Sequence, residues 1–543
     1  MTVREQLNSI AKERILILDG AMGSIIQSLH LDEKSFRGSL FAEHPTPLSG
    51  YNDILCLTRP GAIGAIHDTY LSAGADIIET CSFNSTSISL SDYGLGSLAY
   101  EVSAEAAKVA RKSADKFSAE GKRRFVAGSM GPTAKGASLY PDINNPSKRS
   151  IIWDELEMAY YDNARGLLDG GADILLVETV FDTLNAKAAL RAISRLLEER
   201  QIDVPIMISA AISNENGMLL SGQNLSAFYA SVQYVNPWSI GLNCSFNAPK
   251  LLPHVKQLSE IAQCLVSAYP NAGMPNKFGI YEEMPDAMSA NIEPFFKEGL
   301  VNIAGGCCGS TPAHIAEIAA KAVNYKPRPL PGKSGFKGQK STCNYFSGLQ
   351  PFTAENNIVR IVNNDGSDIT KEFQESLAKG DYEDAADIAR DILESDSAIL
   401  SIKTEDEKAM GAFLDYALMN PYIAKTPFFI NSSNEAVLVA ALKRLQGRCL
   451  AGPINLKDGE IDFLRKIRVI GSFGASAAVT PVDEKGQAET DEQKIEIARR
   501  IYSLLQREKY PAQNCVFYQF ITTEGDSLHS FVRDNCPDVF IAL

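Results

Sequence analysis

Residues 15–23 read ILILDGAMG, a short apolar run that ends in an acidic residue and small residues. Each run of this kind is nearly continuous in apolar residues, as expected for parallel strands covered on both faces. Stretches such as DELEMAYYDNARGLLDGG, residues 154–171, separate the runs and repeat apolar residues at the helical period. Seven further runs follow: ADIIETCSF (75–83), FVAGSMGP (125–132), ADILLVET (172–179), PIMISAAI (205–212), SIGLNCS (239–245), CLVSAYPNAG (264–273) and VNIAGGCCG (301–309).

Eight strands that alternate with helices over residues 1–325 predict an α/β fold of the (β/α)₈ TIM-barrel type. The alternative is a doubly wound open sheet. That fold would more often carry a glycine-rich phosphate loop of the form G-x-G-x-x-G after its first strand, and DGAMGS at 19–24 does not have this form. The barrel is therefore favoured.

The composition limits the class of protein and its partners. The 543 residues are 45% apolar and 22% charged, with a formal net charge of −14, so a nucleic-acid partner is not expected. The sequence has neither a signal peptide nor an apolar run of transmembrane length, which predicts a cytoplasmic protein without a membrane partner. Cysteines in that compartment are mostly reduced. Five of the ten are interpreted as buried apolar side chains: Cys56, Cys264, Cys449, Cys515 and Cys536.

A change in composition follows the predicted barrel. Residues 326–350 are expected to form a linker, since residues 325–342 are rich in Pro, Gly, Lys and Ser. Residues 351–543 predict a second α/β domain, a barrel that is one strand short and has an open edge. Its six or seven strand candidates are NIVRIVNN (357–364), AILSIK (398–403), PFFINSS (427–433), LAGPINL (450–456), IRVIGSFG (467–474), CVFYQFITT (515–523) and DVFIAL (538–543).

Three cysteines follow predicted strands of the first barrel, where the active site of a TIM barrel forms. Cys244 ends the sixth strand, and Cys307 and Cys308 end the eighth. Three thiolates with a fourth position open are the pattern of a catalytic zinc site. The alternatives are buried cysteines or a redox pair. Adjacent cysteines do not have the spacing of a zinc finger.

An open, thiolate-rich zinc site suits one chemistry, the binding and deprotonation of another thiol for alkyl transfer. Asp19 and Glu178 end strands at the same rim and could hold the ammonium group of an amino acid. For each, a helix cap or a supporting hydrogen bond is the alternative. The loop that begins at Ser129 and includes Gly131 offers backbone N–H groups for a carboxylate.

These motifs together resemble the homocysteine-binding module of cobalamin-dependent methionine synthase, over nearly all of residues 1–325. The resemblance implies that Cys244, Cys307 and Cys308 bind zinc, and that Asp19 and Glu178 surround the amino-acid part of homocysteine. Cys81 departs from the pattern, since the family usually has Asn there. The motifs are DGAMG (19–23), ETCSFNST (79–86), GGADILLVETVFDTLNAKAA (170–189), LSGQ (220–223), SIGLNC (239–244), SAYPNAG (267–273) and GGCCG (305–309).

The second segment resembles the folate-binding (pterin-binding) domain of the same enzyme, but in a degenerate form. KGDYEDAADIAR (379–390), AMGAFLDYAL (409–418), INSSNEAV (430–437), NLKDGE (455–460) and DEKGQAETDEQKIEIARR (483–500) keep its order. The family's G-E-R-T-N, D-x-N, I-D-S-S and D-P-N motifs are replaced by NNDGSDIT (363–370), SIK (401–403), INSS (430–433) and YQF (518–520). Each change removes a polar partner of the pterin ring, so no folate-binding residues are expected. The sequence has no D-x-H-x-x-G motif of a cobalamin module.

The sequence therefore predicts zinc-dependent methyl transfer to the thiolate of homocysteine, giving methionine. Methylcobalamin, or another methylated corrinoid, would be supplied in trans by a separate protein. The first alternative is a homocysteine methyltransferase that uses a small donor such as S-methylmethionine. The second is a non-catalytic protein that binds homocysteine for regulation.

Overall fold

A computed structural model describes residues 1–119, 122–142, 144–331, 346–354, 358–363, 366–395, 398–520, 531–532, 534–536 and 539–542. The chain divides into two compact units. Unit 1 comprises Met1–Gly136, Ile151–Ser221 and Val235–Phe336. Unit 2 comprises Ala137–Ser150, Gly222–Tyr234 and Lys337–Leu543. Of the expected linker, residues 332–345 lie outside the described residues.

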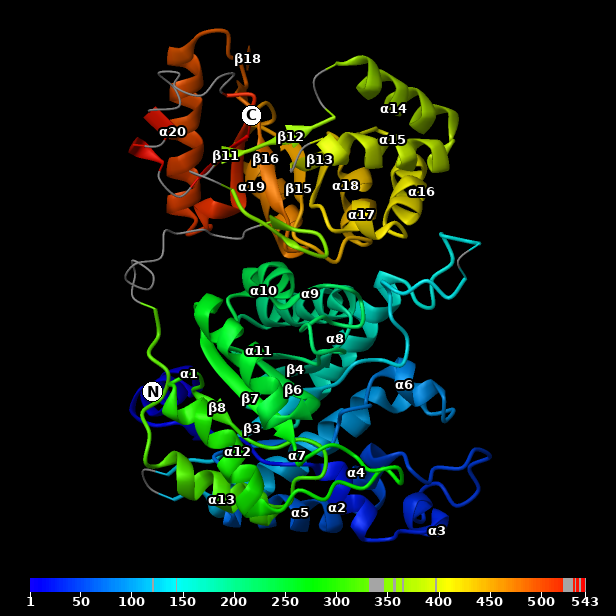
Figure 1. Ribbon diagram of the computed structural model, residues 1–543, viewed down its shortest axis with the longest axis vertical. Helices are drawn as coiled ribbons and strands as arrows, with labels where there is room; N and C mark the ends of the chain where they lie inside the picture. The colour runs from blue at the N-terminus through cyan, green and yellow to red at the C-terminus, as the bar shows by residue number, and fades with distance from the viewer. Residues whose placement is uncertain are drawn as a thin grey trace. The chain divides into compact units, whose positions relative to one another are not determined.

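Unit 1 is a closed barrel of eight parallel strands in the order β1-β8-β7-β6-β5-β4-β3-β2 (Figure 1). A bridge between Leu18 and Ile77 joins β1 to β2 and completes the ring. The predicted (β/α)₈ barrel is confirmed, and every strand coincides with one of the predicted runs, although β4 and β6 extend one and two residues beyond theirs. The strands are β1 (Leu16–Ile17), β2 (Ile77–Glu79), β3 (Phe125–Met130), β4 (Ile174–Val180), β5 (Ile206–Ala210), β6 (Ser239–Asn247), β7 (Leu265–Asn271) and β8 (Ile303–Ala304).

Helices surround this barrel and alternate with its strands (Figure 1). Local signals fix where they begin: Asp182 caps α9 by accepting hydrogen bonds from the backbone N–H groups of Leu184 and Asn185. The α-helices are α1 (Val3–Glu13), α2 (Met22–Ser28), α3 (Glu33–Arg37), α4 (Leu55–Thr58), α5 (Pro60–Ser72), α6 (Ser87–Ser91), α7 (Ala99–Phe117), α8 (Trp153–Asp169), α9 (Thr183–Arg200), α11 (Ala248–Ile261), α12 (Pro285–Lys297) and α13 (Pro312–Ala322). Short 3₁₀ helices are η1 (Asn52–Ile54), η2 (Gly96–Leu98) and η3 (Gln233–Val235), the last of which lies at the boundary of the two units.

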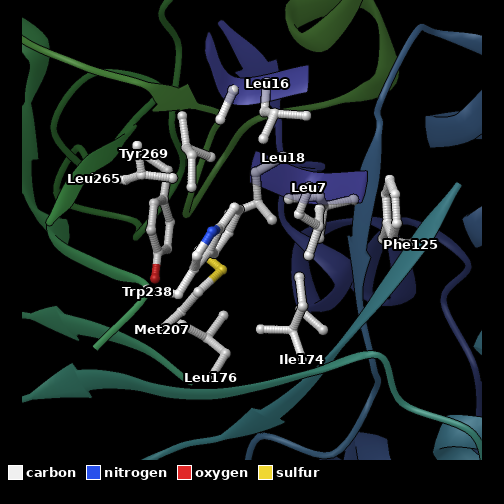
Figure 2. Close-up of a cluster of buried hydrophobic side chains, with 14 residues drawn as sticks. Leu7, Leu16, Leu18, Phe125, Ile174, Leu176, Met207, Trp238, Leu265 and Tyr269 are labelled. Atoms are coloured by element: carbon white, nitrogen blue, oxygen red, sulfur yellow. The ribbon is translucent and has the colours of Figure 1, made fainter. Parts of the chain in front are cut away.

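The core of unit 1 fills the barrel from the amino ends of its strands. Leu7 of α1 packs with Leu16, Phe125 and Ile174 in the cluster of Figure 2. Helix α1 thus closes this end of the barrel, and Trp238 is tied to it through a hydrogen bond from its ring N–H to Asn8. The active site of a TIM barrel forms at the opposite end, where the strands finish.

Unit 2 is a second parallel α/β barrel, as predicted. Its strand order is β11-β20-β19-β16-β15-β14-β13-β12. Only Arg360 separates β11 from β12, so these two strands are halves of one run. The strands are β11 (Ile358–Val359), β12 (Ile361–Val362), β13 (Ile399–Lys403), β14 (Phe428–Asn431), β15 (Leu450–Ile454), β16 (Ser476–Val479), β19 (Cys515–Tyr518) and β20 (Phe540–Ala542).

Two expectations for unit 2 are wrong. The open edge does not exist, because the last strand pairs with the first: Ile358 is opposite Ile541, and Val359 is opposite Ala542. IRVIGSFG is not a strand. Its first six residues end helix α19 (Gly459–Ser472), and the strand is the SAAV segment that follows. β-branched residues on the buried face of a helix gave a false strand signal.

The remaining elements of unit 2 are helices and two antiparallel hairpins. The hairpins pair β9 (Phe346–Ser347) with β10 (Pro351–Phe352), and β17 (Val482–Asp483) with β18 (Gly486–Gln487). The helices are α10 (Leu225–Val232), α14 (Asp368–Lys379), α15 (Tyr382–Ser395), α16 (Glu407–Ala417), α17 (Pro421–Ala424), α18 (Glu435–Leu442), α20 (Asp491–Arg507) and η4 (Ala512–Asn514). Among the described residues, no helix is long and apolar enough to span a membrane.

Candidate metal and substrate site

Three sulfur atoms converge at the carboxyl ends of the strands of unit 1. The Sγ atoms of Cys244, Cys307 and Cys308 all lie within 4.8 Å of one another, and those of Cys244 and Cys308 are 3.6 Å apart. In the described part of the chain this is the one group of three or more Cys, His, Asp or Glu side chains that could hold a metal ion. The structure thus brings together the three cysteines that the sequence singled out.

Cys244 reaches the cluster through an irregularity in β6. The pairing of β6 with β7 shifts register between Cys244 and Asn247, and both Cys244 and Ser245 have left-handed backbone angles, with φ of 52° and 61°. Such angles are uncommon for residues with a side chain and cost free energy. A bulge of this kind redirects a side chain, here the Cys244 thiol, which lies with the sulfurs of Cys307 and Cys308.

Cys307 and Cys308 lie on a loop that the surrounding backbone holds at both ends. The Cys307 N–H donates to Pro270 O at 2.8 Å, and the Ala272 N–H donates to Cys308 O at 2.9 Å. Gly309 follows with φ of +80°, and a Cβ atom there would lie 2.2 Å from the Cβ of Tyr281. Only glycine fits this turn, which presents two adjacent sulfurs to one point.

The donor set fits a zinc ion. Four ligands in a tetrahedron with Zn–S bonds of about 2.3 Å place their sulfurs about 3.8 Å apart, close to the 3.6 Å between Cys244 and Cys308. Hydrogen bonds from Cys244 and Cys307 lower the pKa of Cys308, which favours an anionic sulfur in the cluster. In addition, Oδ1 of Asn271 at the end of β7 is buried without a hydrogen-bond partner among the described residues.

Three carboxyl groups lie at the same end of the barrel. Asp19 accepts a hydrogen bond from the Glu79 backbone N–H at 3.0 Å through Oδ2. Glu178 accepts one from the Ser129 hydroxyl at 2.5 Å and one from the Thr179 hydroxyl at 3.3 Å. Asp19 Oδ1 and Glu79 Oε1 are buried without a partner among the described residues. Neither Asp19 nor Glu178 caps a helix, because the N-caps of α2 and α9 are Ala21 and Asp182.

Burial governs the charge of these carboxyl groups. It raises the pKa of Glu178 to about 7, and it raises those of Asp19 and Glu79 well above their ordinary values. Repulsion within the group adds to the effect, since Glu178 raises the pKa of both Asp19 and Glu79. None of the three forms an ion pair with a Lys, Arg or His side chain in the described part of unit 1. The group is therefore suited to a cationic ligand.

The loop after β3 approaches this group closely. Ser129 is held between β2 and β4, since its backbone N–H donates to Thr80 and its hydroxyl donates to Glu178. At Gly131, a Cβ atom would lie 2.4 Å from the carbonyl oxygen of Phe83. Any larger residue would push the loop away from β2, so the glycine sets how near the loop lies to the carboxyl groups.

Three residues of the site were not among the predicted ones. Glu79 could have been found from its place at the end of a predicted strand, which is the signal that pointed to Asp19 and Glu178. Asn243 is fully buried and connects β4, β5 and β6: it bonds Thr179 through both side-chain atoms and accepts from Ser209 at 2.7 Å. Thr179 has φ of 54° beside a register shift in β4, which turns Glu178 toward the site. Neither role has a sequence signal.

Cys81 does not join the sulfur cluster. It is buried, and its Sγ lies 3.8 Å from Asn52 O and 4.0 Å from Asp53 Oδ1. The neighbouring thiol of Cys56 raises the pKa of Cys81 well above its ordinary value, as does burial. A buried thiol of this kind is inert, so Cys81 packs as a small apolar side chain.

Among the described residues, the carboxyl ends of the unit 2 strands carry no comparable group. Asn363 donates to Ser401 O at 2.9 Å, and Asn431 donates to Ser401 Oγ at 3.4 Å. Tyr518 packs edge-on against Phe429 with the ring centroids 5.1 Å apart. A large ring thus fills the barrel at one of the positions where the resemblance leads to a pterin partner.

Comparison with known proteins relates unit 1 to one family. The model of the homocysteine S-methyltransferase family matches residues 16–322. No model of a pterin-binding or cobalamin-binding family matches the chain. Among solved structures, the oxidized form of the homocysteine methyltransferase MmuM from Escherichia coli is 22% identical, with 59% of this chain and 100% of that chain covered and a TM-score of 0.47. The metallated form of the same protein is 22% identical, with coverage of 58% and 98% and a TM-score of 0.45.

A more distant structure is the B12-independent methionine synthase from Shewanella sp. W3-18-1 in complex with selenomethionine. It is 14% identical, with 50% of this chain and 88% of that chain covered and a TM-score of 0.31. The family match spans more than half of the chain and includes the eight strands of the unit 1 barrel and the whole site described above. The protein therefore belongs to the homocysteine S-methyltransferase family of enzymes.

Proposed function

We propose that this protein transfers a methyl group to the thiolate of homocysteine in a zinc-dependent reaction that gives methionine, with a methylated corrinoid on a separate protein as the donor. The observation that carries the proposal is the convergence of three thiols with three buried carboxyl groups at one end of the same barrel. Thiolate ligands and a cation-binding group are what an amino acid with a thiol side chain requires.

Cys244, Cys307 and Cys308 would hold the zinc ion. When bound, it supplies a Lewis acid that keeps a fourth, substrate thiol deprotonated at neutral pH. The three cysteines fill three tetrahedral positions and leave one for the substrate. The strained backbone at Cys244 and the glycine at 309 fix their geometry before substrate arrives, so little reorganisation accompanies binding.

The carboxyl groups of Asp19, Glu79 and Glu178 would receive the ammonium group of homocysteine. An ammonium satisfies the unpartnered oxygens of Asp19 and Glu79 and offsets the repulsion among the three acids. Ser129 orients Glu178, and the backbone of the loop at Gly131 would face the substrate carboxylate. Homocysteine would then be held at two points, its amino-acid end at the carboxyl groups and its thiol at the zinc ion. This sets the direction in which its sulfur faces the donor.

In the reaction, a new carbon–sulfur bond forms as the bond between the methyl carbon and cobalt breaks, and the bonding electron pair stays on the cobalt. The thiol proton would pass to solvent when homocysteine binds as the thiolate. We favour a corrinoid over S-methylmethionine because unit 2 is fused to the methyltransferase barrel and resembles a domain of a cobalamin-dependent enzyme, while its own pterin positions are lost.

The test is methyl transfer from free methylcobalamin to homocysteine by the zinc-loaded protein, beside a Cys308→Ser variant. Turnover that disappears in the variant, with homocysteine bound only by the zinc-loaded wild type, supports the proposal. Turnover with S-methylmethionine alone would establish the small donor instead. Tight homocysteine binding without turnover from either donor would leave a regulatory binding protein.

A further inference from the structure

Asp53 is a buried acid of unit 1 that has no role in the proposed reaction. It lies in the short helix η1 and is 3% exposed. Among the described residues, no Lys, Arg or His side chain pairs with it. A buried carboxyl group without a cation costs free energy, so the groups that it bonds indicate what it does for the molecule.

The partners of Asp53 all lie in the loop between β2 and α6, residues 80–86. Its Oδ2 atom accepts hydrogen bonds from the Asn84 backbone N–H at 2.6 Å and from the Ser85 hydroxyl at 3.1 Å. Its Oδ1 atom lies 4.0 Å from Sγ of Cys81 in the same loop. One carboxyl group therefore holds the end of the loop that leads into α6.

The other end of this loop holds Ser129, the residue that bonds Glu178. The Ser82 hydroxyl donates to Ser129 O at 2.7 Å, and the Ser129 N–H donates to Thr80 Oγ1 at 2.9 Å. The hydroxyl oxygens of Thr80 and Ser82 are 2.6 Å apart and share a hydrogen bond. The backbone of Ser129 is thus fixed on both sides of its side chain, and this sets the direction from which its hydroxyl donates to Glu178 at 2.5 Å.

The two ends of the loop are joined by a hydrogen bond within it, since the Ser85 N–H donates to Ser82 O at 3.1 Å. An unbroken series of hydrogen bonds therefore connects the carboxyl group of Asp53 to that of Glu178, and its links are Ser85, Ser82 and Ser129. Each of these three serines is at most 1% exposed, so water cannot replace a bond that is lost.

We propose that Asp53 is a positioning residue for the amino group of homocysteine. It holds the β2–α6 loop, the loop holds Ser129, and Ser129 orients the carboxyl group of Glu178 toward the substrate ammonium. This inference rests on the proposed function and extends it to a residue outside the groups that bind the substrate and the metal.

The experiment measures how well an Asp53→Ala variant recognises the amino group. The zinc-loaded wild type and variant are titrated with homocysteine and with 4-mercaptobutanoate, which has the same thiol, chain and carboxylate but no ammonium group. We expect the Kd for homocysteine to rise roughly tenfold in the variant, because the carboxyl group that receives the ammonium loses its support. The Kd for 4-mercaptobutanoate and the zinc content should be unchanged, since neither depends on Glu178.

Two control variants separate positioning from a loss of stability. Asp53→Asn keeps an oxygen that can accept from Asn84 and Ser85, so it should retain the wild-type preference for homocysteine. Asp173→Ala removes a different buried acid, which accepts from the Val126 N–H at 3.0 Å directly before β4, at the amino end of the barrel. It should destabilise the protein and leave the preference unchanged.

Further variants test the links between the two carboxyl groups. Ser82→Ala breaks the link to Ser129 and should weaken homocysteine binding in the same selective way, which keeps the inference testable if Asp53→Ala does not fold. In a Ser129→Ala background, Asp53→Ala should change the preference little further, because Asp53 acts through Ser129. Fully additive effects of the two substitutions would contradict this order.

Three other outcomes would overturn the inference. These are an unchanged preference in both Asp53→Ala and Ser82→Ala, an equal weakening of both ligands, or a loss in Asp53→Asn as large as that in Asp53→Ala, which would assign the effect to charge. Each of them leaves the proposed function intact if the wild type binds homocysteine more tightly than 4-mercaptobutanoate. A wild type that binds neither ligand would refute the proposed function and this inference together.

Discussion

In unit 1, the strand ends carry Asp19, Glu79 and Glu178, acids that have no Lys, Arg or His partner among the described residues. Among the described residues of unit 2, the buried acid is Asp415, which pairs with Arg149 at 2.7 Å and with Arg444 at 3.4 Å. Unit 1 pairs other buried acids in the same way, Asp76 with Arg14 and Arg124, and Asp173 with Arg111 and Arg123. The strand-end acids lack such a partner. A buried acid without a cation costs stability, so these acids mark the place where a ligand completes the structure.

The cysteines show the same contrast. In unit 1, the cysteines at the carboxyl ends of strands lie together in one cluster. In unit 2, Cys449 directly precedes a strand and Cys515 begins one, and each is buried by itself. Burial raises the pKa of Cys515 and keeps it a thiol. The architecture is therefore common to both units, and the chemistry depends on which residues stand at the carboxyl ends of the strands.

The largest expected effect comes from removing one sulfur from each barrel. Cys244→Ser should abolish stoichiometric zinc binding and lower methyl transfer by at least about two orders of magnitude, because a ligand matters more than the groups that support it. Cys449→Ser, a buried thiol in unit 2, should leave both unchanged. Metal analysis after dialysis and initial rates check the pair. Equal zinc contents in the two variants would mean that the cysteine cluster does not hold the metal.

Much of this contrast could be predicted from the sequence. The eight strands of unit 1 follow from apolar runs of the right length, and the cysteines and two of the acids follow from their positions after those runs. In unit 2 the same reasoning failed at IRVIGSFG, since Ile467, Val469 and Ile470 suit a helix packed on a core as well as a strand. The strand that replaced it, at 476–479, is made of small residues and gives a weak signal.

The features that could not be predicted depend on contacts that exist only in the folded barrel. The pairing of β20 with β11 unites segments about 180 residues apart, and nothing in either segment specifies its partner. The roles of Thr179 and Cys244 depend on left-handed backbone angles at residues that rarely adopt them. Asn243 matters because it bonds three strands at once, and this is a property of the barrel rather than of any motif.

The buried acids of the two units should respond with opposite signs to loss of charge. Asp415→Asn should lower the free energy of unfolding of unit 2 by about 3 kcal/mol, since it leaves two arginines without their partner. Glu178→Gln should raise that of unit 1 by roughly 1 kcal/mol at neutral pH, because it removes a buried acid whose ionisation no cation compensates. Both tryptophans, Trp153 and Trp238, belong to unit 1, so their fluorescence in urea follows that unit, and circular dichroism follows both.

The homocysteine affinity provides the control for this pair. Glu178→Gln should weaken homocysteine binding at least tenfold while it stabilises the protein, whereas Asp415→Asn should leave the affinity unchanged. A Glu178→Gln variant that is less stable than the wild type would show that the carboxyl group serves the fold rather than the ligand.

A smaller effect is expected from pH. The pKa of Glu178 is about 7 in the folded protein against an ordinary value of 4.5, so the folded state keeps a proton that the unfolded state releases. The free energy of unfolding of unit 1 without metal should therefore fall as pH rises from 4.5 to 7, by about 2–3 kcal/mol. The titratable groups that face Glu178 are Asp19, Asp53, Glu79, Tyr269 and Cys308. Urea titrations at several pH values should show a shallower decline for Glu178→Gln, and an identical decline would contradict the assignment.

The smallest expected effect tests whether unit 2 retains a ligand of its own. Asn431 stands where the resembled family has Asp, and Tyr518 fills the barrel against Phe429. We expect no saturable binding of 5-methyltetrahydrofolate below about 1 mM in equilibrium dialysis, because each lost polar partner costs a buried pterin about 1–3 kcal/mol. Asn431→Asp should not restore it, since one carboxylate does not remove the Tyr518 ring. Saturable binding to the wild type or to the Asn431→Asp variant would mean that the two barrels are more alike than their strand ends indicate. It would also give this chain a methyl donor of its own.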